Sequence, residues 1–379
     1  MNKLTPRYVF SAERFAERVN YIAEMLPGIQ LVYSMKANPF LLHCLPDKIE
    51  MVEVCSPGEL SICEELSVPG RNILYSGVVK GYEDSVRALK EGARYLTAES
   101  IGQFDIVNKA AKDTGISAKV LLRISSGNQF GMCKEDLFSL IEREKDNPLL
   151  NIVGIHLFSG TSKRRVKAVE KDLNLLEEIL TEVGNRFNFR AEIVEYGPGL
   201  GVDYFEETAE KSETTERSTL EEAAPYLMEF AAKYPLSIEM GRFMAAVSGF
   251  YETTVADIKT TEGVNYAMLD GGIHQLNYYG QNMAMKIPVI LQTPDRPDSE
   301  KKTYCLCGSL CTTADVLVRE VELKELSVGD VLRFERSGAY SVTEAPALFL
   351  SRDMPEIYIE SKGEEKLLRE KKSSYLINF

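Results

Sequence analysis

Short runs rich in Val, Ile, Leu and Tyr alternate with amphipathic stretches along the first two-thirds of the chain. Most of the runs lack a clean polar–apolar alternation, which is typical of parallel strands buried on both faces. Between them, helical patterns such as 12–26 and 163–184 place apolar residues on one stripe. The runs predict eight strands, at 29–37, 50–56, 72–77, 95–100, 119–125, 152–158, 191–197 and 236–242.

Eight strand-then-helix units over about 230 residues match the size of a closed parallel barrel, the (β/α)8 TIM-like barrel of the α/β class. The alternative is an open doubly wound sheet, which needs a reversal of strand order that a sequence cannot show. After Arg242 helical patterns become scarce and turn clusters separate the strand-like runs, so we predict a separate all-β domain. Its strands are predicted at 250–260, 266–270, 286–292, 303–308, 315–323, 330–336 and 356–360.

These patterns divide the chain into two predicted domains. The barrel takes residues 10–245, and a C-terminal all-β domain (a β-sandwich or β-barrel) takes residues 246–379, which residues 1–9 are expected to join. Residues 206–222 are polar and dense in Glu, Thr and Ser. A solvated, mobile loop is the expected structure for that composition.

Charge and composition exclude several classes of partner. A net charge of −13 argues against binding to nucleic acid or to an anionic membrane. No apolar run approaches the roughly 18 residues of a membrane span, and the first six residues contain no apolar signal core. The seven cysteines are odd in number and show no disulfide-framework spacing, which favours a reducing cytoplasm. We therefore predict a cytoplasmic protein.

Catalytic residues of such barrels gather at the C-terminal ends of the strands. The first predicted strand ends at Lys36, and the chain turns immediately afterwards at Asn38-Pro39. A lysine at a barrel mouth can lose water and become a nucleophile that bonds a carbonyl group. An ordinary surface lysine is the alternative, which the turn disfavours because it places Lys36 on the rim. We expect no other amine at this mouth.

Other strand ends carry residues that could bind a cofactor. The fifth ends in Arg123, and the sixth ends in His156, whose flat ring could stack on a cofactor or simply belong to the core. The seventh runs into the glycine-rich turn 197–201, where backbone N–H groups could cradle a phosphate, although tight turns need no ligand. The eighth ends in Glu239 and Arg242, which could hold a pyridine nitrogen and a phosphate, or form a buried ion pair.

Taken in order, these motifs resemble the ornithine/diaminopimelate decarboxylase family, whose relatives share an alanine-racemase-like barrel. The likeness covers nearly the whole chain, and each motif is weak alone while the ordered set is highly specific. The resemblance implies a pyridoxal 5'-phosphate-dependent decarboxylase that removes the α-carboxylate of an amino acid. The matching segments are 33–39, 53–59, Arg123, 130–132, 156–160, 197–201, 239–242, 308–315 and 337–340.

The resemblance also implies residue roles. Lys36 would carry the cofactor, His156 would stack on its ring, and Glu239 would bind the ring nitrogen. Cys311 would act as a proton donor across the interface of a head-to-tail homodimer with shared sites. The remaining cofactor contacts implied are Arg123, Ser159, Gly197, Gly199, Gly241, Arg242 and Tyr340, and the substrate contacts are Thr312, Asp315, His274 and Tyr278. No metal is expected, because Cys305, Cys307 and Cys311 lack paired Cys-x-x-Cys units.

Two departures from the family pattern bear on the substrate. Diamine-forming members carry an acidic residue after the motif cysteine, where this chain has Thr312, and diaminopimelate-specific relatives place an arginine downstream of the Gly-Gly motif, where segment 271–280 contains none. A neutral hydroxyl cannot pair with a buried ammonium. Together with the segment 345–351, these features look more like a branch that acts on aminoacyl groups, such as glutamyl, tethered to a carrier protein.

Three functions therefore remain open. The chain could decarboxylate a free diamino or dicarboxylic acid, or a carrier-bound aminoacyl group. It could also be a racemase or a small cofactor-binding homeostasis protein. Glu239 argues against the racemase, whose family prefers an arginine at the ring nitrogen. The all-β domain argues against the homeostasis protein, which is a bare barrel.

Overall fold

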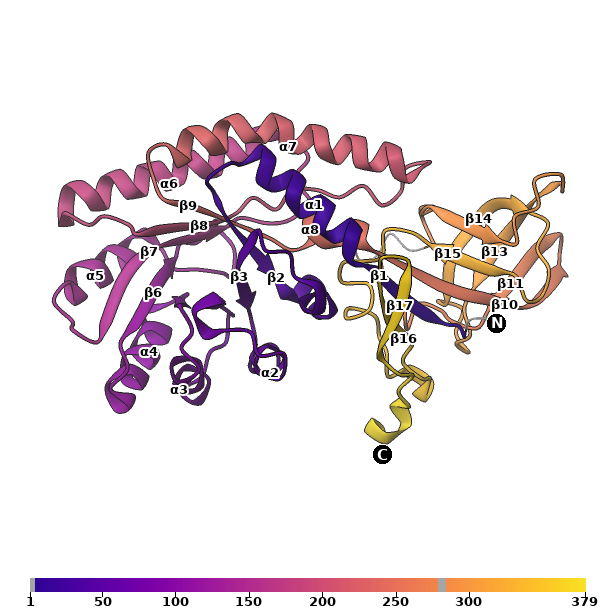
Figure 1. The fold of residues 1–379 in the computed structure, drawn as a ribbon, viewed down its shortest axis with the longest axis horizontal. Coiled ribbons are helices and arrows are strands. Elements are labelled where there is room, and N and C mark those ends of the chain that lie inside the picture. The colour runs from indigo at the N-terminus through magenta and orange to yellow at the C-terminus, as the bar shows by residue number, and fades with distance from the viewer. Residues whose placement is uncertain (1–3, 279–283) are drawn as a thin grey trace. The chain divides into compact units, whose positions relative to one another are not determined.

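The computed structural model describes residues 4–278 and 284–379, so that the end of the glycine-rich segment 271–280 lies outside the described residues. Contacts group the chain into two compact units (Figure 1). The barrel unit consists of Val19–Gly201 and Arg217–Phe243, and the β unit consists of Met1–Arg18, Val202–Glu216 and Met244–Phe379.

Eight parallel strands close into a ring in the barrel unit. They are β2 (Gln30–Ser34), β3 (Ile49–Val54), β4 (Ile73–Tyr75), β5 (Tyr95–Ala98), β6 (Ala118–Arg123), β7 (Leu150–Phe158), β8 (Ile193–Gly197) and β9 (Leu236–Met240). β2 pairs with both β3 and β9, which closes the sheet. The predicted closed barrel is confirmed, and the open doubly wound sheet is excluded.

Helices follow the barrel strands and lie outside the ring (Figure 1). A serine before each of two helices accepts a backbone N–H as an N-cap, Ser56 from Glu59 and Ser100 from Gln103. One buried apolar cluster crosses seven of the eight strands through Val32, Met51, Leu74, Tyr95, Leu121, Val153 and Ile193. The helices of the chain are α1 (Ala12–Met25), α2 (Pro57–Glu65), α3 (Tyr82–Lys90), α4 (Ile101–Thr114), α5 (Lys134–Glu144), α6 (Val166–Phe187), α7 (Ala209–Ala231) and α8 (Arg242–Ala245).

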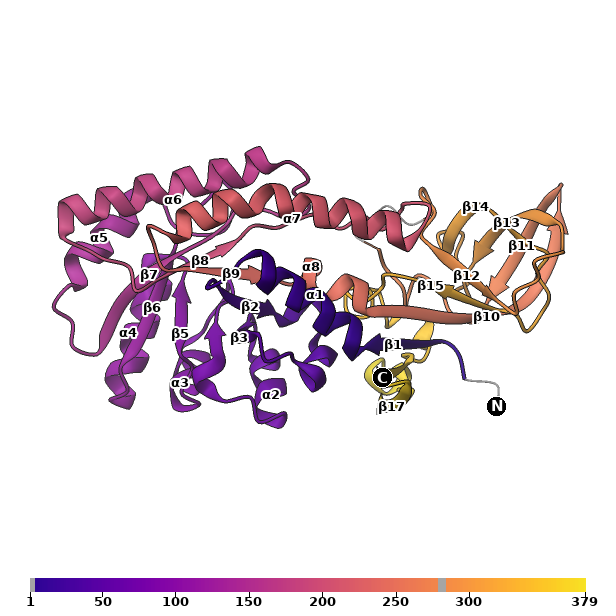
Figure 2. The ribbon, with the colours of Figure 1, turned by 45° about the horizontal axis from the view of Figure 1, so that its top comes forward.

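The β unit is built on a nine-stranded sheet whose main path runs β14-β13-β11-β10-β1-β16-β17, with β15 paired to β10 and β12 paired to β15. β1 pairs with β10 and β16, so residues near the N-terminus are part of this sheet. Figure 2 shows β11, β13 and β14 gathered at one end of the long strand β10. The strands are β1 (Arg7–Ser11), β10 (Gly249–Thr261), β11 (Val264–Leu269), β12 (Ile290–Thr293), β13 (Lys301–Cys307), β14 (Val316–Lys324), β15 (Val331–Phe334), β16 (Glu356–Ser361) and β17 (Glu364–Arg369).

The loop predicted at 206–222 is wrong, because most of this segment belongs to helix α7. Its polar composition conceals a buried carboxylate. Glu216 is 1% exposed and accepts hydrogen bonds from the side chains of Arg18 and Arg336 and from the backbone N–H of Asp203. This buried and paired charge holds the segment against the rest of the unit. The segment is therefore not the solvated loop that its composition suggests.

Candidate active site at the barrel mouth

Lys36 lies directly after β2, in the short turn Met35–Ala37. Asn38 ends this turn, and its side chain accepts the backbone N–H of Phe40 at 3.0 Å. The Lys36 amino group is 2.8 Å from Oε2 of Glu53 and 3.6 Å from Oε1 of Glu239. The Lys36 side chain is 39% exposed, whereas both carboxylates are buried. The strand end therefore presents one amine, oriented by two acidic side chains, toward the mouth of the barrel.

Glu239 stands at the C-terminal end of β9, as predicted. Ser34 Oγ lies 2.5 Å from its Oε1 and 2.6 Å from Oε2 of Glu53, so one hydroxyl links the two carboxylates. The other oxygen of Glu239 is 3.4 Å from Nε2 of His156 and has no hydrogen-bond partner among the described residues. Burial alone would raise the pKa of Glu239, but Lys36 and His156 outweigh it and hold that pKa well below its usual value. Glu239 is therefore a buried carboxylate that stays ionised.

Glu195 on β8 is a second buried carboxyl group with the opposite behaviour. It lies in register with His156 on β7 and Ser237 on β9. It is 0% exposed, and neither carboxyl oxygen has a hydrogen-bond partner in the described part of the chain. Burial, with the negative charge of Glu239, raises its pKa well above the usual value. The site thus holds one ionised and one neutral acid, a pattern found where acid–base roles are divided. Glu195 was not among the site residues predicted from the sequence.

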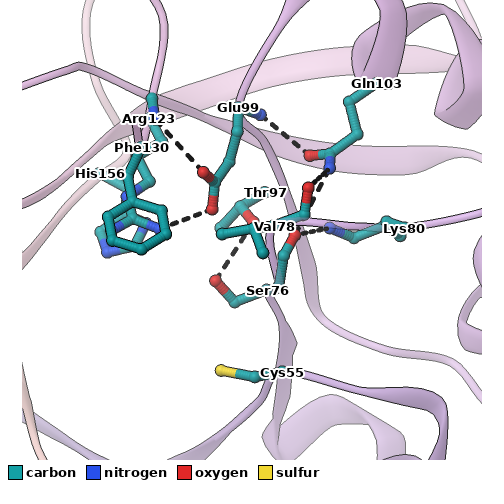
Figure 3. A network of polar contacts seen from close by, with 12 residues as sticks. Cys55, Ser76, Val78, Lys80, Thr97, Glu99, Gln103, Arg123, Phe130 and His156 are labelled. Carbon is teal, nitrogen blue, oxygen red and sulfur yellow. Dashed lines mark hydrogen bonds and ion pairs between the residues drawn. The ribbon is translucent and has the colours of Figure 1, made fainter. Parts of the chain in front are cut away.

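Arg123 and His156 are neighbours on β6 and β7, where Cα positions of the two residues pair. Figure 3 shows the Arg123 guanidinium against Glu99 and Phe130. Nη1 of Arg123 is 2.5 Å from Glu99 Oε1, and the guanidinium carbon is 4.9 Å from the Phe130 ring centre. The other oxygen of Glu99 accepts the backbone N–H of Gly131 at 3.2 Å. Arg123 therefore fixes the loop after β6, next to a buried histidine whose two nitrogens have no hydrogen bond within the described residues.

The glycine-rich turn after β8 is closely packed. A Cβ on Gly199 would lie 1.9 Å from the carbonyl oxygen of Gly160, and the Gly199 φ of +60° is also one that side chains disfavour. A Cβ on Gly197 would meet the ring of Phe158 at 2.6 Å. Gly241, which follows β9, is less tightly enclosed, because a Cβ there would lie 3.0 Å from Ser34 and Ala37 and would need only a small shift of these neighbours. Gly197 and Gly199 must be glycine for the backbone to pack as it does.

The expectation that no other amine lies at the mouth is wrong. Lys80 follows β4 and is only 2% exposed. Its amino group donates to the carbonyl of Gly77 at 3.3 Å (Figure 3). The same group lies 5.3 Å from the centre of the Tyr75 ring. Burial lowers the pKa of Lys80 to about 8. No sequence signal marks this residue, because the same loop exposes Val79 and buries the lysine, against the usual preference.

Lys163 is a second amine near the strand ends, in the loop after β7. Its amino group contacts Ser159 and Asp172, and burial lowers its pKa although Asp172 acts in the opposite direction. The run Lys163-Arg164-Arg165, which follows the predicted His156–Gly160 motif after Thr161-Ser162, was the signal that could have indicated it.

In the β unit, Cys311 and Thr312 lie on the loop between β13 and β14. Cys311 is exposed and Thr312 is half-buried. Asp315 is buried, and its two carboxyl oxygens accept the backbone N–H groups of Ile273 at 2.9 Å and Leu310 at 2.7 Å. Asp315 therefore links the backbone at Ile273 to the backbone at Leu310.

The other predicted residues of the β unit are also largely enclosed. Tyr278 is 0% exposed and its hydroxyl donates to the carbonyl of Glu335. His274 is 1% exposed, and burial together with Arg352 lowers its pKa to about 4. Tyr340 has a φ of +63° on the loop after β15. Hence the structure brings Lys36, Glu239 and His156 together within one unit, while Cys311, Thr312 and Tyr340 belong to the other.

The barrel end fits the chemistry of pyridoxal phosphate. The cofactor's aldehyde needs an amine, its ring nitrogen needs an ionised carboxylate, and its phosphate suits a glycine-rich turn whose backbone it can approach. Lys36, the unpartnered oxygen of Glu239 and the glycine turn 197–201 supply these. A barrel enzyme that uses pyridoxal phosphate is the class that fold and site define.

The family comparison agrees with this class. The family profile described as "Pyridoxal-dependent decarboxylase, pyridoxal binding domain" matches residues 12–246. The chain belongs to this family, and it is a pyridoxal-phosphate-dependent amino acid decarboxylase, as its motifs predicted.

Several relatives resemble the chain over nearly its whole length. L-glutamyl-[BtrI acyl-carrier protein] decarboxylase of Niallia circulans is 26% identical, covering 97% of this chain and 91% of the relative. The 2-[(L-alanin-3-ylcarbamoyl)methyl]-2-hydroxybutanedioate decarboxylase of Staphylococcus aureus is also 26% identical, over 95% of each chain. The crystal structure of diaminopimelate decarboxylase from Methanocaldococcus jannaschii has a TM-score of 0.86 at 24% identity and covers 98% of this chain and 90% of that one, which supports the fold.

Within residues 4–278 and 284–379, no helix is long and apolar enough to cross a membrane. Within the same residues, no group of three or more His, Cys, Asp and Glu side chains could hold a metal ion.

Proposed function

We propose that the chain decarboxylates an aminoacyl substrate whose distal end is masked as a thioester or amide, with a carrier-tethered group as the leading case. The observation that carries this proposal is the loop at Thr312. Its single carboxylate, Asp315, already accepts two backbone N–H groups, so no acid on this loop remains for a distal ammonium. Burying an ammonium without a counter-charge is expensive.

The relatives support the same substrate class. The name of the Niallia circulans enzyme describes a glutamyl group on an acyl-carrier protein. The name of the Staphylococcus aureus enzyme describes an alanine unit whose side chain is joined through a carbamoyl group. In neither name does the distal end of the amino acid carry a free ammonium. Diaminopimelate decarboxylases are also among the relatives, and a free diamino acid is therefore the alternative that the experiment below must separate.

Within the barrel, Lys36 would hold the cofactor aldehyde, and His156 would lie against the ring. Glu239 would keep the ring nitrogen protonated, with Ser34 and Glu53 orienting its carboxylate. When bound, pyridoxal phosphate supplies an electron sink for the electron pair left by the departing carboxylate. Arg242 and the glycine turn would bind the phosphate, together with Gly241 and Tyr340.

We further propose a cytoplasmic head-to-tail homodimer in which Cys311 delivers a proton to the α carbon at the partner subunit's site. Cys311 is exposed, and it belongs to a different compact unit from Lys36. In a C₂ dimer each contact is repeated by symmetry, so that each Cys311 would serve the partner subunit's site.

Mixing two inactive variants tests the shared sites. Cys311→Ala subunits mixed with Lys36→Ala subunits should restore about a quarter of wild-type activity, because random pairing gives half heterodimers with one intact site each. Activity is measured before and after subunit exchange, which is verified by native mass spectrometry. If exchange is complete and no activity returns, the sites are not shared between subunits.

Thr312→Glu tests the substrate class. Wild type should turn over free meso-diaminopimelate, lysine and ornithine poorly, and a carrier-bound aminoacyl group efficiently. The new carboxylate should raise kcat/KM on the free diamino acids at least about tenfold, since a hydrogen-bonded charge is worth roughly 1.5–3 kcal/mol. The measurement is amine formation from each substrate with both proteins.

The adjacent Thr313 provides a matched control for this experiment. Thr313 is exposed on the same loop, so Thr313→Glu adds the same charge one residue away. It should leave the substrate preference of the wild type unchanged. Efficient wild-type turnover of free meso-diaminopimelate would contradict the masked-substrate proposal and favour the free diamino acid.

A further inference from the structure

A polar cluster beside the glycine turn contains two residues without an assigned role in the cofactor site, Lys163 and Asp172. Lys163, in the loop after β7, donates from its amino group to Ser159 Oγ at 2.5 Å and to the carboxylate of Asp172. Ser159 Oγ donates to the same carboxylate oxygen at 2.5 Å, and the Tyr196 hydroxyl donates to it at 2.9 Å. Asp172 on α6 is 7% exposed. Three donors therefore converge on one oxygen of a buried carboxylate.

The backbone of Lys163 is joined to the glycine turn from both sides. Its N–H donates to the carbonyl of Gly199 at 2.8 Å, and its carbonyl accepts the N–H of Gly201 at 2.9 Å. The turn is also closely packed, since a Cβ on Gly199 would lie 1.9 Å from the carbonyl oxygen of Gly160. The ammonium and the carboxylate of this cluster are therefore fixed next to the turn that would bind the cofactor phosphate.

The carboxylate in this arrangement would repel an anion bound beside it. Ser159 was expected to bind the phosphate, yet its hydroxyl proton is directed at Asp172. A phosphate beside Asp172 would meet a like charge at short range and in a partly buried place, where screening is weak. Lys163 is the cation in direct contact with that carboxylate. Without it the acidic side chain would face the phosphate uncompensated.

We propose that Lys163 is a positioning residue of the phosphate site, which neutralises Asp172 so that the glycine turn and Ser159 can accept the phosphate of the cofactor. Burial lowers the pKa of Lys163 while Asp172 acts in the opposite direction, and an arriving phosphate would likewise favour the charged form of the amine. Asp172 in turn holds Lys163, Ser159 and Tyr196 in one fixed arrangement.

The test measures equilibrium binding to the cofactor-free protein, independently of turnover. Lys163→Met should weaken binding of pyridoxal phosphate at least tenfold and leave binding of pyridoxal, which lacks the phosphate, within twofold of wild type. Lys163→Arg should retain most of the phosphate preference, because it keeps the charge. Arg165→Met, which removes a nearby cation from the same loop, is the matched control and should bind both ligands as wild type does.

The decisive variant removes the carboxylate as well. In Lys163→Met/Asp172→Asn, pyridoxal phosphate binding should return to within about threefold of wild type, because the uncompensated charge is gone. A structural role alone would make the double variant as weak as or weaker than Lys163→Met, and would weaken pyridoxal equally. Either result overturns the proposal, as does a Lys163→Met protein with unchanged phosphate preference. Thermal unfolding of each cofactor-free variant identifies any loss of folding, in which case Lys163→Gln replaces Lys163→Met.

Discussion

Lys36→Ala should abolish covalent attachment of the cofactor and reduce decarboxylation below detection. Lys36 is the amine at the end of β2. Its amino group lies 2.8 Å from Oε2 of Glu53 and 3.6 Å from Oε1 of Glu239. In the variant, the aldehyde of a bound cofactor would have no amine to react with at the position that the site orients. The measurements are the visible absorbance of the protein after incubation with pyridoxal phosphate, and the mass of the chain after borohydride reduction.

Lys80 supplies the control for this result. It is buried near the same strand ends, and its pKa of about 8 leaves part of it neutral, and so nucleophilic, at mildly alkaline pH. Lys80→Met alone should leave borohydride labelling intact, and Lys36→Ala should remain unlabelled at pH 7 and at pH 9. Labelling of Lys36→Ala that disappears in the double variant would place the cofactor on Lys80 and contradict the assignment of Lys36.

The rule that places catalytic groups at the C-terminal ends of barrel strands was enough to predict part of this site. Lys36, His156 and Glu239 each end a strand in the sequence, and the structure brings all three together. The rule works because parallel strands in a closed ring deliver their ends to one face. It needs only the strand boundaries, which the apolar runs indicate.

The residues that tune the site could not be predicted in the same way. Glu195 and Ser34 matter through their register and burial, and these depend on which residues of neighbouring strands pair. Lys80 was missed because a buried lysine contradicts the preference on which sequence reading relies. Helix α7 was missed for the same reason, because a buried charge contradicts that preference. Its Glu216 makes buried contacts with Arg18 and Arg336, although the polar composition of the segment predicted a solvated loop.

Glu239→Gln should leave the cofactor bound but slow decarboxylation by about 10²–10⁴-fold, the scale of losing one preorganised electrostatic group or more. The Glu239 carboxylate is 5% exposed and its pKa is held well below the usual value by Lys36 and His156 against the effect of burial. An amide of the same shape cannot provide the negative charge that keeps the ring nitrogen protonated. The measurements are kcat under saturating substrate and the cofactor content of the purified variant.

Glu195→Gln is the matched substitution, because it makes the same change on the neighbouring strand β8. Burial and the charge of Glu239 raise the pKa of Glu195 well above its usual value, which favours the neutral form of this side chain. Replacing a neutral acid by a neutral amide should change kcat by less than about tenfold, within the range of a lost or altered hydrogen bond. Equal losses in the two variants would show that packing, and not charge, explains the effect at Glu239. Near wild-type turnover of Glu239→Gln would remove the ring-nitrogen role altogether, since the charge is the property by which the two carboxyl groups differ.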